Sequence, residues 1–243
     1  MAVERHGRVK EHRPDADISS LEGVFGRIFG SWPVITEEAR LPAEPPALLP
    51  EEAAQVADSV TRRRVEFATG RLCARRALGR LGIDAFVLRN DARRMPQWPP
   101  GIVGSLTHTG GVPGGYCAVA VARADAILTV GIDAELADGL PLHLWRFVLT
   151  SAEQGWLAGR DTERQGLLAK VIFSAKESFY KAQFPLTGRS LDFHDVQVEL
   201  DMERGAFMTR MFEGSAAGLE VGHWSGRFYL DEEFVRTALV APR

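Results

Sequence analysis

Charged residues interrupt two otherwise apolar stretches of the sequence, VGIDAE at 130–135 and VIFSAKESFYKA at 171–182. In the first stretch, the two-residue period of a strand puts Gly131, Asp133 and Glu135 on one face and apolar residues on the other. Carboxylates that project side by side repel each other unless water solvates the strand end or a cation lies between their oxygens. The stretch therefore fits either a polar strand end or part of a site for a hard divalent cation.

The second stretch has the spacing of an amphipathic helix. Its apolar stripe consists of Ile172, Ala175, Phe179 and Ala182. On the simplest interpretation, Glu177 and Lys181 form an exposed ion pair four residues apart, worth about 0.2–0.5 kcal/mol. On the alternative interpretation, this helix crosses the end of the 130–135 strand. Glu177 then supplies a third carboxylate, and Lys176 and Lys181 supply counter-charges for phosphate.

Basic residues gather upstream, in TRRRVEFATGRLCARRALGRLG at 61–82. Helical spacing brings Arg64, Arg71 and Arg75 to within about 40° of each other around the axis. Such a row suits a ligand with several phosphates, and it is also typical of a solvated helix face. In GSLTH, Thr107 and His108 follow a strand that is expected to end at Leu106, at a corner suited to phosphate binding or to a structural histidine.

The elements that must position these residues are both helices and strands. Helices are expected at 51–81, at about 141–158 and at 163–184. Strands are expected in CAVAVA and AILTVGIDAE, joined by a tight turn at 123–125. Three or more antiparallel strands are expected in HDVQVEL, AFMTRMF and GRFYLDEEFVRTALVA. The sequence therefore predicts an α+β fold, with strands and helices in both halves.

The composition is that of an ordinary globular protein: 243 residues, 45% hydrophobic and 25% charged. The formal charge of -3 provides no global basic field for nucleic acid. We find no apolar stretch of signal-peptide or membrane-spanning length, which predicts a cytoplasmic protein without a membrane partner. Cys73 and Cys117 are the only cysteines and fit reduced, buried thiols better than a disulfide or a zinc site.

Four segments, in this order, resemble the 4'-phosphopantetheinyl transferases of the Sfp/EntD type, especially their compact actinobacterial-like members. They are EFATGRLCARRAL, GSLTHTGG, VGIDAE and FSAKESFYKAQFPLTGRSL, within residues 66–191. The resemblance implies a pseudo-twofold arrangement of two similar α+β lobes, with the active site in the cleft between them. We expect a flexible tail at 1–18, an N-terminal lobe at 19–124 on the nucleotide side of coenzyme A, and a C-terminal lobe at 125–243 with the catalytic carboxylates.

The resemblance also implies roles for the acidic residues and lysines. Asp133, Glu135 and Glu177 match the carboxylates that bind Mg²⁺, or Mn²⁺ in its place, and Glu177 also matches the general base. Lys176 and Lys181 match lysines that lie near the pyrophosphate and the leaving group.

For the nucleotide, His108 matches a histidine that contacts a phosphate of coenzyme A, and Thr107 occupies the small hydroxyl position before it. Arg71 matches an arginine near the 3'-phosphate, and Arg63 and Arg89 are further candidates for the nucleotide end. The loop GGVPGGY at 110–116 is longer and richer in glycine than is usual in the family, so its contacts are not carried over.

The implied activity is transfer of the phosphopantetheine arm of coenzyme A to a serine of an apo acyl, polyketide or peptidyl carrier protein by a monomeric enzyme. Two alternatives stay open. The same carboxylates and basic residues would serve a Mg²⁺-dependent hydrolase of coenzyme A-like diphosphates. A non-catalytic relative that only binds carrier proteins is the other, although the intact carboxylate set argues against it.

Overall fold

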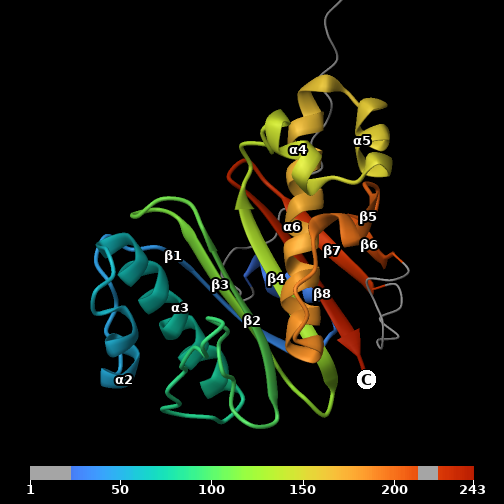
Figure 1. The fold of residues 1–243 in the computed structure, drawn as a ribbon. Helices are drawn as coiled ribbons and strands as arrows, with labels where there is room; N and C mark the ends of the chain where they lie inside the picture. Colours follow the sequence, from blue (N-terminus) through green and yellow to red (C-terminus); the bar gives the residue numbers. More distant parts are fainter. Residues whose placement is uncertain (1–22, 213–223) are drawn as a thin grey trace, which may run out of the picture.

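The computed structural model describes residues 23–212 and 224–243, so the tail predicted at 1–18 lies outside the described residues. Its strands form two antiparallel sheets (Figure 1). The first sheet has the order β1–β3–β2, with β1 at Val34–Arg40, β3 at Tyr116–Arg123 and β2 at Ile102–Thr109. The second has the order β4–β8–β7–β6–β5, with bounds Ile127–Leu136, Phe234–Pro242, Trp224–Leu230, Ala206–Met211 and Val196–Asp201. The predicted α+β class is confirmed, and so are the antiparallel strands of the C-terminal half.

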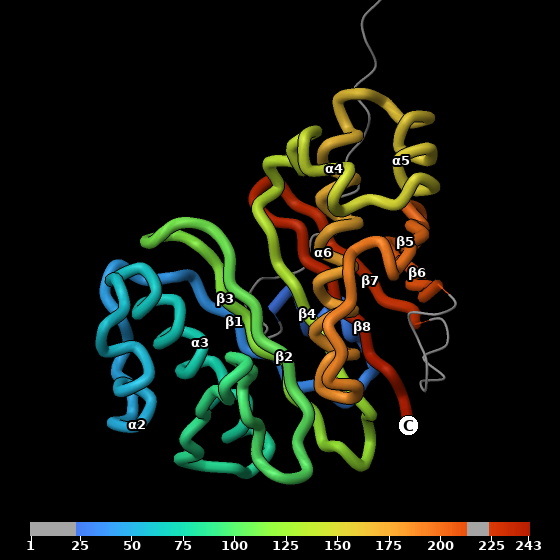
Figure 2. The backbone as a smooth tube through the Cα atoms, viewed as in Figure 1, coloured from blue at the N-terminus to red at the C-terminus, as the bar shows by residue number. Residues whose placement is uncertain are grey.

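Each sheet packs against one long helix, as the backbone trace also shows (Figure 2). In the first half, α3 (Thr61–Arg80) packs on β3 and β1, with Cys73, Ala77 and Leu78 in the core against Val119 and Val121. The short helices α1 (Val24–Phe29), α2 (Pro50–Ala53) and η1 (Ala54–Val56) precede it. The helix predicted at 51–81 is therefore interrupted, because the residue before α3 is extended (ψ 154°).

In the second half, α6 (Thr162–Thr187) packs on β4 and β8 and confirms the helix predicted at 163–184. All four residues of its apolar stripe lie in the hydrophobic core. The helix predicted at 141–158 is in fact two, α4 (Leu142–Val148) and α5 (Ser151–Ala158). Thr150 ends the continuity by capping α5, because its Oγ1 accepts a hydrogen bond from the Glu153 backbone N–H at 3.2 Å. A short helix, η2 (Phe193–Asp195), leads into β5, and no helix among the described residues has the length and apolarity to cross a membrane.

The two sheets meet where β2 runs beside β4. The predicted turn after Arg123 is confirmed, but the strands that it joins, β3 and β4, belong to different sheets. On the edge of β4 that faces β2, the Ile132 N–H donates to Ser105 Oγ and the Ala134 N–H donates to Thr107 Oγ1, each at 3.1 Å. Hydroxyl side chains thus satisfy backbone groups that would otherwise be buried without a partner. The turn after β3 separates the sheets, and the lobe limits 19–124 and 125–243 stay a prediction.

The strand β2 also extends further than its predicted end at Leu106. Thr107 and His108 continue the pairing with β3, opposite Ala118 and Cys117. Both residues therefore lie within a strand and not at a corner. Thr107 points toward β4 and α6, and His108 points toward α3.

Gly131 is the point where α6 crosses β4. A Cβ atom at this position would lie 2.0 Å from the Ser178 carbonyl oxygen and 2.9 Å from the Ala182 Cβ. The face of β4 that carries Gly131 and Asp133 therefore packs against α6. The two-residue period predicted that these residues share one face, and the crossing of the strand by the helix agrees with the hypothesis made for Glu177. Only a glycine allows the helix to approach this closely.

We expect Gly131→Ala to lower the free energy of unfolding by about 1–3 kcal/mol, because the new methyl group must displace the backbone of α6. Gly155→Ala is the matched control. Its Cβ would meet no atom within 4 Å, and inside α5 the change should stabilise the protein by about 0.5–1 kcal/mol. Urea unfolding of both variants measures the difference, and equal stability of the two would contradict the close approach.

Candidate active site

Asp133 is the centre of the site. Its side chain is buried, with 3% of the residue exposed. Its Oδ1 accepts hydrogen bonds from Lys181 Nζ at 2.6 Å and from Thr107 Oγ1 at 3.2 Å, and its Oδ2 accepts one from Ser174 Oγ at 2.8 Å. These donors come from β2 and α6, so one carboxylate on β4 joins the three elements that form the cleft.

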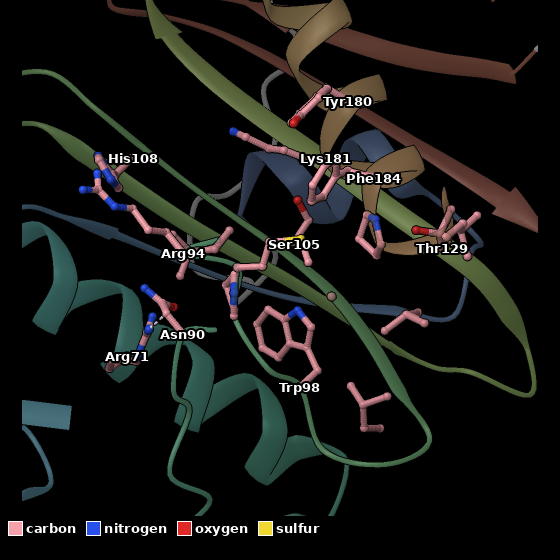
Figure 3. A pocket seen from close by; sticks show the side chains of 18 of the residues that line it. Arg71, Asn90, Arg94, Trp98, Ser105, His108, Thr129, Tyr180, Lys181 and Phe184 are labelled. Carbon is pink, nitrogen blue, oxygen red and sulfur yellow. Dashed lines mark hydrogen bonds between the residues drawn. The ribbon is translucent and has the colours of Figure 1, made fainter. Parts of the chain in front are cut away.

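Lys181 does not form the simple helix-surface ion pair with Glu177 that its spacing allows. Its ammonium group pairs with Asp133, donates to Thr107 Oγ1 at 3.3 Å and keeps 27% of the side chain exposed. In the close-up, this side chain leaves α6 on the side where His108 lies (Figure 3). The helix therefore crosses β4 and brings Lys181 to Asp133, as the alternative interpretation required of α6.

Glu135 and Glu177 lie half-buried on β4 and α6. Burial, reinforced by the Asp133 charge, raises the pKa of Glu135 to about 7. Burial and the Asp133 charge also raise the pKa of Glu177. Because the three carboxylates act on each other electrostatically, a cation that joined them would relieve both the repulsion and the cost of burial.

The chemistry of this donor set fits a hard divalent cation. Within residues 23–212 and 224–243, no group of three or more His, Cys, Asp or Glu side chains is close enough to hold a metal ion by itself. Mg²⁺, however, is commonly held by one or two carboxylates, with water and substrate phosphates completing its octahedron. Asp133, Glu135 and Glu177 therefore fit a metal that arrives together with a phosphorylated substrate.

A cavity of about 450 Å³ lies between the two halves, beside this centre. Basic side chains are concentrated in part of its wall: Arg63, Arg71, Arg94, His108 and Lys181. Apolar and aromatic side chains form another part: Met95, Trp98, Leu128, Phe184 and Leu186. A wall with a cationic part and an aromatic part suits a ligand that has both phosphates and a flat ring (Figure 3).

Arg71 is a buried cation in this wall. Its Nη2 donates to Asn90 Oδ1 at 2.6 Å, and its guanidinium carbon lies 4.0 Å from the centre of the Phe67 ring. Burial lowers the pKa of Arg71 to about 10, so the group stays charged at neutral pH. Its Nε has no hydrogen-bond partner among the described residues. An anion in the cavity would compensate this buried charge.

His108 lies in a positively charged part of the same wall. Arg63 Nη1 is 3.3 Å from its Nε2, and Glu66 Oε2 is 3.8 Å from its Nδ1. Burial lowers the pKa of His108, and the charges of Arg63 and Lys181 lower it further, whereas Glu66 opposes the shift. The neutral imidazole and the two cations form a pocket in which an anion is favoured.

The structure places Lys176 away from this cavity. It is buried, with 3% exposed, and its Nζ donates to Glu153 Oε2, Val148 O and Phe193 O, each at 2.8 Å. Burial lowers the pKa of Lys176, while the Glu153 carboxylate opposes that shift. This geometry contradicts the prediction that Lys176 faces phosphate, because all three hydrogens of its ammonium group are donated within the protein.

The arginine row predicted on α3 does not form one ligand face either. Arg71 lines the cavity, but Arg75 is bound to Glu52 Oε2 at 2.6 Å and to Ala47 O at 2.9 Å, and Arg64 is exposed outside the cavity wall. Arg89, predicted at the nucleotide end, is also exposed outside that wall. Arg63, one helical turn from Glu66, provides the second arginine of the site.

A second cavity of about 240 Å³ lies on another side of α6. It is lined by α6 side chains, including Glu177 and Tyr180, and by the segment from Ser190 to Phe193. Tyr180 lines both cavities. Glu177 and Lys181 therefore lie on one stretch of α6, with Glu177 in the wall of the second cavity and Lys181 in the wall of the first.

Several contributing residues were not identified from the sequence. Ser174 lies three residues before Glu177, and its place on a buried helix face was a readable signal for an interior hydrogen bond. Asn90, which holds Arg71, lies in an irregular segment 19 residues away, and no sequence pattern connects the two. Tyr180 has no distinguishing feature in the sequence, and only the two cavities that it lines indicate its role.

Comparison with known proteins shows the family to which this chain belongs. The family model for the 4'-phosphopantetheinyl transferase N-terminal domain matches residues 51–122, and that for the 4'-phosphopantetheinyl transferase superfamily matches residues 129–236. The 4'-phosphopantetheinyl transferase Svp of Streptomyces mobaraensis is 42% identical over 222 residues, covering 89% of this chain and 88% of Svp. PptT of Mycobacterium tuberculosis is 39% identical, covering 83% and 90%, and Npt of Nocardia iowensis is 34% identical, covering 78% and 87%. Both carry the same transferase name.

The chain therefore belongs to the 4'-phosphopantetheinyl transferase superfamily, as its sequence motifs predicted. Its activity is that of the family, in which the phosphopantetheine group of coenzyme A is transferred to apo carrier proteins.

We expect the Glu135 carboxyl to titrate near pH 7 in the free protein. Because the folded protein binds this proton more tightly than the unfolded chain does, the group's contribution to stability is present below about 4.5 and is lost as the pH rises through about 7. Asp133→Asn should lower the pKa of Glu135 by removing a neighbouring negative charge. Asp125→Asn, in the exposed turn before β4, is the control and should leave it unchanged. Side-chain ¹³C NMR follows the titration, and an identical curve in all three proteins would disprove the coupling.

Proposed function

We propose that this chain transfers the 4'-phosphopantetheine arm of coenzyme A to a serine of an apo acyl, polyketide or peptidyl carrier protein, with Asp133, Glu135, Glu177 and Lys181 at the reaction centre. The observation that carries the proposal is that Lys181, paired with Asp133, lines the larger cavity, whereas Glu177, one turn away on the same helix, lines the smaller one. Coenzyme A has the matching shape: a phosphorylated nucleotide at one end, an extended arm at the other, and a pyrophosphate between them.

The larger cavity would hold the nucleotide. Its apolar and aromatic side chains suit the adenine ring, and Arg63, Arg71 and His108 suit the phosphates. The Nε of buried Arg71, which has no hydrogen-bond partner among the described residues, supports this orientation, because a 3'-phosphate oxygen could accept its hydrogen. Lys181, which lines the same cavity close to Asp133, would then face the pyrophosphate.

The smaller cavity would hold the arm. Its wall contains Phe179, Leu191 and Phe193, which suit a chain of methyl and methylene groups, and Glu177 belongs to the same wall. The bond that breaks in the reaction would then lie beside α6, between Lys181 and Glu177.

Asp133, Glu135 and Glu177 would hold Mg²⁺, or Mn²⁺ in its place, and the metal when bound supplies positive charge against the pyrophosphate oxygens. The identity of the metal and the class of carrier protein are both part of what we propose. The monomeric state and the cytoplasmic location stay predictions from the sequence.

In the reaction, the serine oxygen of the carrier attacks the β-phosphorus, and the bond from that phosphorus to the bridging oxygen of 3',5'-ADP breaks. The serine hydroxyl is a weak nucleophile, and Glu177 would accept its proton, directly or through a water molecule. Lys181 would stabilise the negative charge that remains on the departing 3',5'-ADP.

Intact-mass analysis of an apo carrier protein, after incubation with this protein, coenzyme A and Mg²⁺, tests the proposal. We expect the carrier to gain one phosphopantetheine group. Glu177→Gln should slow the transfer by about 10²-fold or more, because a general base typically contributes that much. Glu163→Gln, an exposed residue in the first turn of the same helix, is the control and should transfer normally.

Product analysis in the same experiment distinguishes the alternatives. Release of phosphopantetheine from coenzyme A without any carrier would indicate a hydrolase. Coenzyme A binding without transfer to acyl, polyketide or peptidyl carriers would indicate a non-catalytic relative, and either result would overturn the proposal.

We also expect chelation of divalent ions to abolish transfer and Mg²⁺ to restore it. The Mg²⁺ concentration that gives half the maximal rate should fall as the pH rises through about 7, because Glu135 must lose its proton to bind a cation. Steady-state rates at several pH values and Mg²⁺ concentrations measure this dependence. Full activity in excess EDTA would exclude a role for the metal, and a comparison with Mn²⁺ shows which ion serves better.

A further inference from the structure

We propose that Lys176 is a positioning residue. Its buried ion pair with Glu153 fixes the segment 190–193, which forms one part of the wall of the second cavity, against α6, which forms another part and includes Lys176. Its ammonium group does not contact phosphate. This inference rests on the proposed function, because it treats the second cavity as the place of the pantetheine arm.

The Lys176 side chain points away from the cleft that Lys181 faces. Lys176 and Lys181 are five residues apart on α6, so they project about 140° apart around the helix axis. Lys181 reaches Asp133 in the cleft, whereas Lys176 reaches Glu153 on α5. The two lysines that share one sequence motif therefore serve different sides of the helix.

Both charged groups of the pair have their hydrogen bonds made within the protein. The Lys176 ammonium group donates to Glu153 Oε2, Val148 O and Phe193 O, each at 2.8 Å. Glu153 is 2% exposed, and it also accepts hydrogen bonds from the Thr150 N–H and the Val198 N–H, each at 2.7 Å. A buried pair with every hydrogen bond made holds its surroundings in one arrangement, and turning the lysine toward a ligand would leave Glu153 without its counter-charge.

The pair joins five segments of the C-terminal half. They are the end of α4, the start of α5, α6, η2 and β5, through Val148, Glu153, Lys176, Phe193 and Val198. The bond to the Phe193 carbonyl acts on the cavity directly, because Phe193 belongs to its wall. The Phe173 ring, with its centre 5.6 Å from that of Phe193, packs against the same segment. Loss of the pair would release this wall from α6, next to Glu177.

The test compares Lys176→Met, Glu153→Gln and the double variant by thermal unfolding and by binding of two ligands, coenzyme A and 3',5'-ADP. We expect each single variant to lower the melting temperature and to weaken coenzyme A binding by about tenfold, within the range of couplings inside one network. The affinity for 3',5'-ADP, which lacks the arm, should stay unchanged. Because both residues act through one ion pair, the double variant should bind coenzyme A no more weakly than either single variant.

A matched control exists in the other half of the chain. Glu52 is a fully buried carboxylate that pairs with Arg75 at 2.6 Å and accepts a backbone hydrogen bond from the Leu49 N–H at 3.2 Å. Glu52→Gln and Arg75→Met should lower the melting temperature without changing the ratio of the two ligand affinities. That ratio separates positioning of the cavity wall from a loss of stability alone.

Two results would overturn the proposal. If Lys176→Met weakens coenzyme A binding while Glu153→Gln binds and melts like the unmodified protein, Lys176 contacts the ligand itself. If the variants lower the melting temperature but keep the normal ratio of affinities, the pair is only structural. Should Lys176→Met not fold, Glu153→Gln and the charge-balanced double variant decide the question in the same way.

The outcome is separable from that of the proposed function. The unmodified protein is tested first for transfer to an apo carrier, and failure there refutes the proposed function whatever the variants do. Transfer by the unmodified protein, together with normal ligand affinities in Glu153→Gln, refutes only the role of the ion pair.

Discussion

The buried carboxylate of Asp133 is the constraint on which the rest of this structure depends. An ionised carboxylate that is nearly removed from water must have its oxygens satisfied, and hydrogen bonds to a charged group contribute about 1.5–3 kcal/mol each. Here Thr107, Ser174 and Lys181 supply the donors, from one strand of the first sheet and two turns of α6. The same bonds that make the burial tolerable also hold the two halves of the chain around the cleft. At Asp133, the same hydrogen bonds therefore stabilise the fold and set the geometry of the reaction centre.

The junction between the sheets follows from the same requirement. The Ser105 and Thr107 hydroxyls are two residues apart on β2, and they accept from N–H groups that are two residues apart on β4. Side chains thus take the place of a backbone ladder. Thr107 contributes twice, because its oxygen accepts from the Ala134 N–H and its hydroxyl hydrogen reaches Asp133. Thr107 therefore has a structural role at the position where the family resemblance predicts a small hydroxyl residue near the ligand.

Buried ion pairs support the site from a distance in both halves. Glu153 with Lys176, and Glu52 with Arg75, each combine a buried carboxylate with backbone N–H groups at the start of a helix and a cation from the long helix of the same half. Such pairs are costly to bury, and breaking one partner is more costly still. They leave Arg63, Arg71, His108 and Lys181 as the basic groups that face the larger cavity together with Arg94. The cationic residues of the sequence are thereby divided between those that hold the fold and those available to a ligand.

The sequence by itself determined the features that depend on period and local chemistry. The two-residue period fixed which face of β4 carries Asp133, and the helical period fixed the buried stripe of α6, because both are set by the backbone alone. The family motifs, which combine residue types with order along the chain, were enough to identify the superfamily. The break before α5 was also readable, since TSAE at 150–153 has the spacing of a capping box.

Only the tertiary structure decided which charge meets which. Glu177 and Lys181 have the spacing of a helix-surface pair, yet Lys181 pairs with Asp133, because α6 crosses β4 at Gly131 and puts that carboxylate closer. Lys176 is next to Glu177 in the sequence, but its hydrogen-bond acceptors, Glu153 and two backbone carbonyls, lie 17 to 28 residues away along the chain. Arg75 and Arg71 lie one turn apart on α3, and only the position of Glu52 removes the first from the cavity. The physical reason is common to all three: the energy of a charge depends on the burial and the partners at its final position, and these are set by packing between distant segments, which no local pattern records.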